Sequence, residues 1–275
     1  AIAEAYKIGP YVQYSKNLFG RLDITAGIRY DCFNYLNDES TVSPRMSAGF
    51  YILDNLKFNT SYGIYHQALP LLWLISYDQN KDLKQIKTNQ FVTGIEYYPS
   101  SDLKITVEYF EKQYSDYPNS ILNPQVTYAN AGAEYQTLGL EPLLPASDGF
   151  ARGVEFFIQK KLSDDFYGTF NYSFSKIRFT SLDKVDRPSS FDYGHVLTAI
   201  LGYKIYDNLE ISAKYRFMGG KPYTPLDEEA SAQLNQTVYD FERYNSVRYN
   251  DYQRLDIRID YRFELFGWNL TTYID

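Results

Sequence analysis

Apolar and charged residues alternate one by one along several segments of the chain. The clearest case is Arg254–Glu264, and Leu22–Asp31 and Leu209–Met218 follow the same pattern. Successive side chains of a β-strand point to opposite faces, whereas a helix would scatter these residues around its axis. Each segment is therefore predicted to be a strand with one apolar and one charged face. In Arg254–Glu264 the apolar positions are Leu255, Ile257, Ile259, Tyr261 and Phe263.

Weaker forms of the same alternation occur along the rest of the chain. They bring the prediction to about twelve strands of roughly ten residues, the length that crosses a bilayer when a strand is tilted. A hydropathy scan would miss such strands, because only every second residue faces lipid. The further strands are expected near 6–16, 43–53, 57–64, 90–97, 104–109, 154–159, 169–174, 197–203 and 268–275.

The connections between these strands alternate between short and long. Short turns at one rim and long loops at the other are typical of an outer-membrane barrel, and a soluble sandwich has no reason to keep that order. The 29 tyrosines and 18 phenylalanines also suit the aromatic girdles of a membrane interface. We therefore predict an all-β, antiparallel, up-and-down transmembrane β-barrel in the outer membrane, in contact with its lipid. The short turns lie near Asn17–Arg21, Asp54–Asn55, Ser100–Asp102, Ser163–Asp165, Tyr206–Asn208 and Leu265–Gly267, and the long loops span 32–42, 66–86, 115–148, 178–191 and 219–251.

Other classes of function find little support. The net charge of -7 gives no basic footprint for nucleic acid. The single cysteine, Cys32, allows no intrachain disulfide and no cysteine zinc cluster. Neither His66 nor His195 lies in a metal-binding motif, and no nucleophile or phosphate-loop motif is present. We expect no enzyme activity, no metal site and no cofactor.

Longer stretches carry a family resemblance. The segment RYNDYQRLDIRIDYRF (Arg248–Phe263), followed by FGWNLTTYID, resembles the C-terminal barrel region of TonB-dependent outer-membrane receptors of the type common in Bacteroidetes-like bacteria. The resemblance extends over most of the chain, although no single motif is diagnostic. Other stretches that agree with it are SPRMSAGF (Ser43–Phe50), FNTSYGIYHQ (Phe58–Gln67), GFARGVEFFIQKKL (Gly149–Leu162), NYSFSKIR (Asn171–Arg178), DYGHVLTAILGYK (Asp192–Lys204) and KYRFMGGKPYTP (Lys214–Pro225).

The resemblance implies gated import of a scarce or large ligand, such as an iron chelate, cobalamin or a glycan. A 22-stranded barrel would hold an N-terminal plug, on which an inner-membrane TonB complex pulls. Residues 1–275 contain neither plug nor TonB-binding segment, and Thr271–Asp275 reads as an interrupted strand. We expect a single domain that is a barrel portion truncated at both ends. A passive channel or porin, and a structural or adhesive barrel, remain the alternatives.

Three regions are candidates for ligand contact. The apolar loop Ala68–Tyr77, with Trp73 and Tyr77, could grip a ligand or a surface lipoprotein, or it could pack into the barrel mouth or extend a strand. In loop 219–251, rings and a guanidinium suit recognition of a sugar or chelate, unless the loop folds on its own side chains. The ladder of charges around Arg258 would form either a substrate track or a self-neutralising lumen wall. The candidate residues in loop 219–251 are Tyr223, Arg243 and Tyr244.

Overall fold

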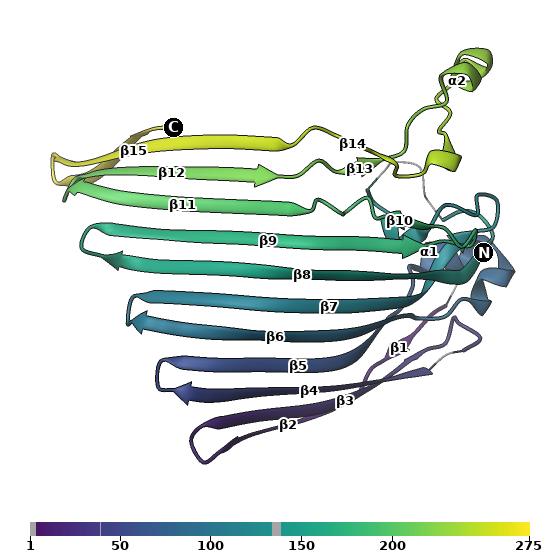
Figure 1. The fold of residues 1–275 in the computed structure, drawn as a ribbon, viewed down its shortest axis with the longest axis horizontal. Helices are drawn as coiled ribbons and strands as arrows, with labels where there is room; N and C mark the ends of the chain where they lie inside the picture. Colours follow the sequence, from purple (N-terminus) through teal and green to yellow (C-terminus); the bar gives the residue numbers. More distant parts are fainter. Residues whose placement is uncertain (1–3, 39, 134–138) are drawn as a thin grey trace.

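Twelve long strands run side by side in chain order (Figure 1). The computed structural model describes residues 4–38, 40–133 and 139–275. Each long strand is antiparallel to the next, so the predicted strands and all six predicted short turns are confirmed. The long strands are β2 (Tyr11–Leu18), β3 (Leu22–Phe33), β4 (Ser40–Leu53), β5 (Leu56–Gln67), β6 (Ile86–Ser100), β7 (Leu103–Ser120), β8 (Leu143–Ser163), β9 (Phe166–Thr180), β11 (His195–Tyr206), β12 (Leu209–Met218), β15 (Tyr252–Leu265) and β16 (Trp268–Ile274).

The long connections and the segment before β2 carry the short elements, all at one end of the sheet (Figure 1). None of the helices in the described ranges is long and apolar enough to cross a bilayer. Among the short strands, β1 pairs with β3, β10 with β9, and β13 with β14. The short elements are β1 (Lys7–Ile8), α1 (Leu71–Ser76), η1 (Asp78–Asp82), η2 (Tyr128–Asn130), β10 (Asp186–Pro188), β13 (Pro222–Tyr223), α2 (Glu228–Leu234), η3 (Phe241–Arg243) and β14 (Val247–Arg248).

Several strands are longer than the alternation predicted. β7 continues to Ser120 and β8 begins at Leu143, inside the expected loop 115–148. Near these ends the side chains on the apolar side become polar, for example Glu111 and Arg152, while the strand pairing continues. The alternation therefore marks the part of each strand that lies in lipid and stops where that face meets water.

The strand register gives the sheet one apolar face. Residues opposite each other in an antiparallel pair lie on the same face, so rows of partners can be followed from strand to strand. One row crosses ten strands and contains only apolar and aromatic residues. It begins at the turn that follows β2 and ends near the loop end of β12, a stagger that accompanies strand tilt in barrels. The row is Leu18, Leu22, Phe50, Phe58, Ile95, Val107, Phe156, Tyr172, Leu197 and Phe217.

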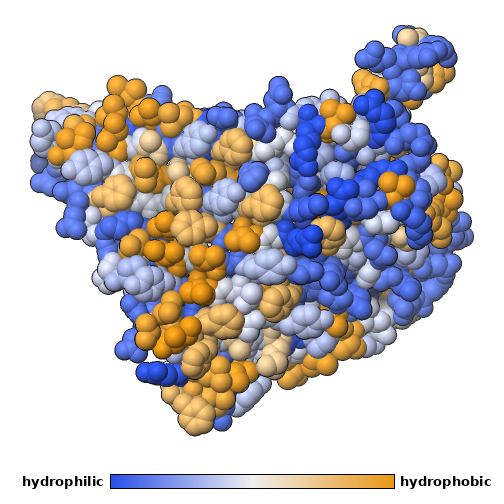
Figure 2. Space-filling model, in the orientation of Figure 1, coloured by the Kyte–Doolittle hydropathy of each residue, from blue (hydrophilic) through white to orange (hydrophobic). Residues whose placement is uncertain are grey.

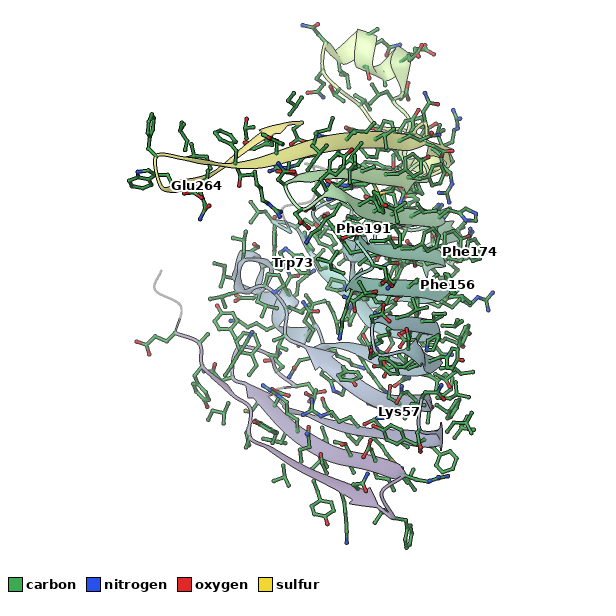
Figure 3. All side chains as sticks on the ribbon, turned by 90° about the vertical axis from the view of Figure 1, so that its left-hand side faces the viewer. Lys57, Trp73, Phe156, Phe174, Phe191 and Glu264 are labelled. Carbon is green, nitrogen blue, oxygen red and sulfur yellow. The ribbon has the colours of Figure 1, made fainter. Side chains whose placement is uncertain are left out.

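The sheet is curved, so it has a concave inner face and a convex outer face. Seen along the strands, Phe156 and Phe174 project from the convex outer face, whereas Trp73 and Glu264 lie on the concave inner side (Figure 3). On the outer face, apolar side chains gather over the half near the short turns and polar ones over the half with the loops (Figure 2). Within the described ranges the sheet is open, with β2 and β16 at its edges.

A substitution on the apolar row tests whether the outer face lies in lipid. Val107→Arg is expected to lower the free energy of unfolding by roughly 2–4 kcal/mol, because a charge near the bilayer midplane loses its hydration. Asn171→Arg is the matched control, since Asn171 lies at similar depth but is exposed on the inner face, opposite Phe157 and Thr198. The measurement is urea unfolding in phospholipid vesicles. Equal losses for both variants would contradict a lipid-facing outer surface.

Candidate ligand-binding site

The loop after β5 folds inward over the loop end of the sheet, which we call the mouth. Residues Leu71–Ser76 form helix α1, and Trp73 stands on the concave side of the sheet (Figure 3). Trp73 meets Tyr128 edge to face, with ring centroids 5.0 Å apart. Of the readings left open for this loop, packing into the mouth is observed and extension of a strand is not. The buried cluster around α1 contains Phe33, Leu36, Leu69, Leu74, Leu83, Ile86, Tyr128 and Leu143.

One side of the α1 segment remains accessible. The exposed fractions of Leu72, Ile75 and Tyr77 are 49%, 48% and 44%. Leu74 in the same helix is fully buried. The segment therefore divides into an anchoring side and an apolar exposed side that could contact a ligand or a partner.

Asn80 ties three chain segments together beneath α1. Its side-chain amide donates to the Trp73 carbonyl at 2.7 Å and to the Glu141 carbonyl at 3.0 Å. Its side-chain oxygen accepts from the Leu143 amide at 2.9 Å. Asn80 is fully buried, so each lost bond would leave a buried polar group unsatisfied. This one side chain therefore fixes the position of α1 relative to the start of β8.

A carboxylate next to this junction binds two hydroxyl groups. Glu141 accepts from Tyr128 Oη and from Ser120 Oγ, both at 2.5 Å. Burial, and then the hydrogen bond to Glu141, raises the pKa of the Tyr128 phenol. Tyr128 therefore remains a neutral donor at ordinary pH and supports the ring of Trp73 from below.

The long loop 219–251 is tied to its neighbours by a second polar network. Asn245 donates to the Pro188 carbonyl at 3.0 Å, and Arg248 forms an ion pair with Asp192 at 2.5 Å. The Tyr244 hydroxyl accepts from Asn130 at 3.2 Å, and Tyr244 is only 5% exposed. Tyr244 thus supports the loop from inside, and any effect it has on a ligand would be indirect.

The other candidates in this loop differ in their surroundings. Tyr223 stacks on Tyr249 with ring centroids 4.2 Å apart, which agrees with a loop that folds on its own side chains. Arg243 is exposed, and no ion pair to it is found in the described part of the chain. Asp227 caps helix α2 by accepting from the Ala230 amide at 2.9 Å. No group of three potential metal ligands occurs within the described ranges.

The predicted charge ladder lines the inner face of β15. Arg254 pairs with Asp256 at 2.7 Å, Arg258 with Asp260 at 2.8 Å, and Arg262 with Glu210 at 3.1 Å. Each arginine therefore has a carboxylate nearby, as expected for a self-neutralising wall. Arg258 also lies over the Tyr273 ring, 3.9 Å from its centroid.

Toward β12, cationic side chains on the inner face outnumber the carboxylates that could neutralise them. A hollow of about 670 Å³, which we call the basic hollow, is lined by the cations Lys214, Arg216, Arg254 and Arg258 and the carboxylates Asp256 and Asp275, among others. Arg216 lies directly opposite Arg254 in the register, and Lys214 opposite Asp256. Neither Lys214 nor Arg216 has an ion pair within the described residues. The hollow thus carries excess positive charge and favours an anionic ligand.

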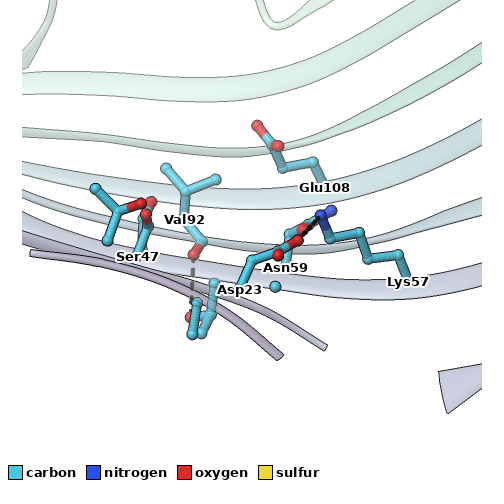
Figure 4. Close-up of a pocket in the computed structure, with 11 residues that line it drawn as sticks. Asp23, Ser47, Lys57, Asn59, Val92 and Glu108 are labelled. Atoms are coloured by element: carbon cyan, nitrogen blue, oxygen red, sulfur yellow. Dashed lines mark hydrogen bonds and ion pairs between the residues drawn. The ribbon is translucent and has the colours of Figure 1, made fainter. Parts of the chain in front are cut away.

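A second hollow, of about 280 Å³, lies on the inner face of β3–β7 (Figure 4). At one end Lys57 pairs with Asp23 at 2.9 Å, and Glu108 stands on the far side. Glu108 is the direct partner of Glu155 on β8, and neither carboxylate has an ion pair in the described part of the chain. Like charges directly opposite repel, so this pair would be stabilised by a cation brought into the lumen.

The sequence alone did not identify these additional charged residues as candidates. Glu108, Glu155, Lys214 and Arg216 each occupy the polar side of an alternating segment, which was recognised. What makes them notable is which residue lies opposite, and that depends on the register between strands. The alternation within one segment carries no information about this pairing.

Removal of the Asn80 junction should loosen the mouth. Asn80→Ala is expected to cost about 1–3 kcal/mol of local stability, because three buried polar groups lose their partner. Gln79→Ala is the matched control. Gln79 is the exposed neighbour of Asn80, and its replacement should change stability by less than about 0.5 kcal/mol. Hydrogen exchange followed by mass spectrometry would report faster exchange in residues 68–86 and at the Leu143 amide. Unchanged exchange in the Asn80 variant would contradict this role.

Comparison with known proteins places the chain in a family. Residues 3–275 match the family model described as TonB dependent receptor-like, beta-barrel. No significant match was found among curated proteins.

Solved structures share the fold at low sequence identity. The FrpB iron transporter of Neisseria meningitidis (F3-3 variant) has a TM-score of 0.69 at 16% identity, covering 98% of this chain and 40% of the transporter. The ferripyoverdine receptor of the outer membrane of Pseudomonas aeruginosa, bound to ferripyoverdine, has a TM-score of 0.68 at 16% identity, covering 94% of this chain and 32% of the receptor. The ferric-catecholate import receptor Fiu of E. coli K12 has a TM-score of 0.67 at 11% identity, covering 94% and 38%.

The chain thus spans between 32% and 40% of the length of these solved receptors. The matched model covers nearly the whole chain, and the register, turns and faces agree with a barrel wall. The resemblance seen in the sequence is therefore confirmed: the chain belongs to the β-barrel family of the TonB-dependent receptors, proteins of the Gram-negative outer membrane.

Proposed function

We propose that this barrel wall belongs to a receptor that imports an anionic iron chelate by TonB-dependent gating. The observation that carries the proposal is the basic hollow on the inner face, where Lys214 and Arg216 have no ion pair within the described residues. A ligand that passes the mouth would meet this positive surface. Iron chelates with ionised oxygen donors are a class that such a surface attracts.

The solved relatives support the choice of substrate class. They are an iron transporter, a receptor bound to ferripyoverdine and a ferric-catecholate import receptor. Cobalamin and glycans, the other ligands considered from the sequence, have less support, since neither requires a positively charged wall. At the mouth, Trp73, Tyr77, Tyr223 and Arg243 remain proposed ligand-site residues, together with Arg258 in the lumen. Tyr244 is buried and would act only by supporting the loop. The exposed side of α1 is where a surface lipoprotein would contact this chain.

Uptake of radioactive ferric chelates by whole cells tests the proposal. Cells that carry the full-length receptor should accumulate iron only when the TonB complex is energised and should lose uptake when the receptor gene is deleted. Uptake that persists after dissipation of the proton gradient would instead indicate a passive channel. Surface binding of cells or proteins without any uptake would indicate an adhesive barrel.

The basic hollow gives a residue-level prediction. The double variant Lys214→Gln/Arg216→Gln should reduce uptake of an anionic ferric chelate about tenfold, because two charge-assisted contacts are lost. Lys16→Gln, on the outer face of β2 opposite Ile24, is the control and should leave uptake unchanged. Uptake of a neutral chelate by the double variant should also be unchanged. A loss of equal size for the neutral chelate would contradict charge recognition.

The pair Glu108 and Glu155 is proposed to bind a cationic side chain of a plug inside the barrel. Replacement of both by Gln should weaken plug docking in the full-length receptor by about 3 kcal/mol, since the plug cation would lose its counter-charges. Conductance of planar bilayers under increasing urea would report earlier opening of the pore. Glu264→Gln, on the inner face near a short turn, is the matched control. Unchanged or later opening in the double variant would contradict the proposed contact.

A further inference from the structure

Two cations lie side by side on the outer face, just beyond the apolar part of the sheet. Arg152 on β8 and Lys176 on β9 are direct partners in the register. The preceding outer-face row toward the short turns is Tyr109, Val154 and Phe174. Tyrosine and phenylalanine at this position suit the aromatic girdle of a membrane interface. The two cations therefore follow directly after the girdle, on the side of the long loops.

Strand length places this pair at the level of lipid headgroups. A strand crosses the hydrocarbon core with about 9–11 tilted residues. On β9 the stretch from Phe166 to Phe174 has that length, and Lys176 is the next residue on the outer face. On β8 the corresponding stretch runs from Leu162 to Val154, and Arg152 comes next. Both side chains thus emerge where the acyl chains of the outer leaflet end.

One carboxylate stands against the two cations in their outer-face row: Glu111 on β7 is the register partner of Arg152. Both side chains are exposed, and neither takes part in an ion pair within the described residues. Asp186, which lies farther toward the loops, pairs with Arg178 at 2.5 Å. Glu111 accepts from Tyr109 Oη at 3.0 Å and from the Gln113 amide at 3.1 Å. Two like charges directly opposite destabilise a strand pair unless an anion lies between them.

We propose that Arg152 and Lys176 bind the phosphate of a phosphorylated lipid headgroup in the outer leaflet. A guanidinium and an ammonium on adjacent strands can each donate to the phosphate oxygens, and the attraction is strongest where water is partly excluded. The acyl chains of the same lipid would lie over Val154 and Phe174. This inference concerns the outer face and does not depend on what the receptor transports.

The surface above the pair has room for the rest of a headgroup. A hollow of about 500 Å³ on the outer face is lined by Arg152 and Arg178 and by the carboxylates Glu111, Asp148 and Asp186, among others. Asp148 and Asp186 lie two outer-face rows farther toward the loops than Arg152 and Lys176, whereas Glu111 lies in the same row as the two cations. The row from Glu111 to Lys176 thus holds two cations and one carboxylate, and its excess positive charge favours a phosphate between Arg152 and Lys176.

Native mass spectrometry of the full-length, delipidated receptor in detergent tests the proposal, with diphosphoryl lipid A as the probe. Arg152→Gln/Lys176→Gln should weaken binding of this probe about tenfold, because two charge-assisted contacts to one phosphate are lost. Arg152→Lys/Lys176→Arg should retain binding. Lys112→Gln removes a cation from the inner face of β7 and is the matched control, expected to bind like the wild type.

Three results would overturn the inference. Equal binding by the wild type and the double glutamine variant would show that the pair does not hold the lipid, provided that both migrate as folded barrels in unheated gels. Equal binding of lipid A stripped of its phosphates would show that phosphate is not recognised. Full competition by inorganic phosphate would assign the pair to a free anion instead of a lipid headgroup.

Discussion

The hydrogen-bonding needs of the backbone govern the rest of this structure. In a bilayer no water is available to an unpaired N–H or C=O group, so every membrane-crossing strand must pair with a neighbour on each side. The antiparallel ladder from β2 to β16 meets this need within the described ranges for all strands except those at the two edges. Once the ladder is formed, alternate side chains face lipid and lumen. The apolar row from Leu18 to Phe217 and the charged inner wall are consequences of the same pairing.

A consequence of this architecture is that burial is concentrated in the mouth. A single sheet layer has no second layer to pack against, and its large outer residues remain exposed until lipid covers them. The buried apolar cluster instead surrounds α1, and buried polar side chains such as Asn80 and Asn245 join loops that are far apart in sequence. These contacts hold the loops over the loop end of the concave inner face.

Features that depend on the order of residues within one segment could be predicted from the sequence. Features that depend on how strands pair with each other could not. The alternation in Arg254–Glu264 predicted β15, and the order of short and long connections predicted the two ends of the sheet. The predicted lengths of β7 and β8 were too short, because outside the lipid the outer face becomes polar while strand pairing continues. The sequence also left α1 undecided, since a short apolar run fits a helix, a strand or a packed loop equally well.

The candidate site shows the same division. The sequence by itself determined that this chain forms strands with a lipid face and a polar face, because alternation is a property of neighbouring residues. It also identified Trp73, Tyr223 and Arg258 as candidates from residue type. Only the tertiary structure decided that Tyr244 is buried, that Arg216 faces Arg254, and that Glu108 faces Glu155. The reason is that a shift of one residue between strands changes every cross-strand pair and leaves the sequence of each strand unaltered.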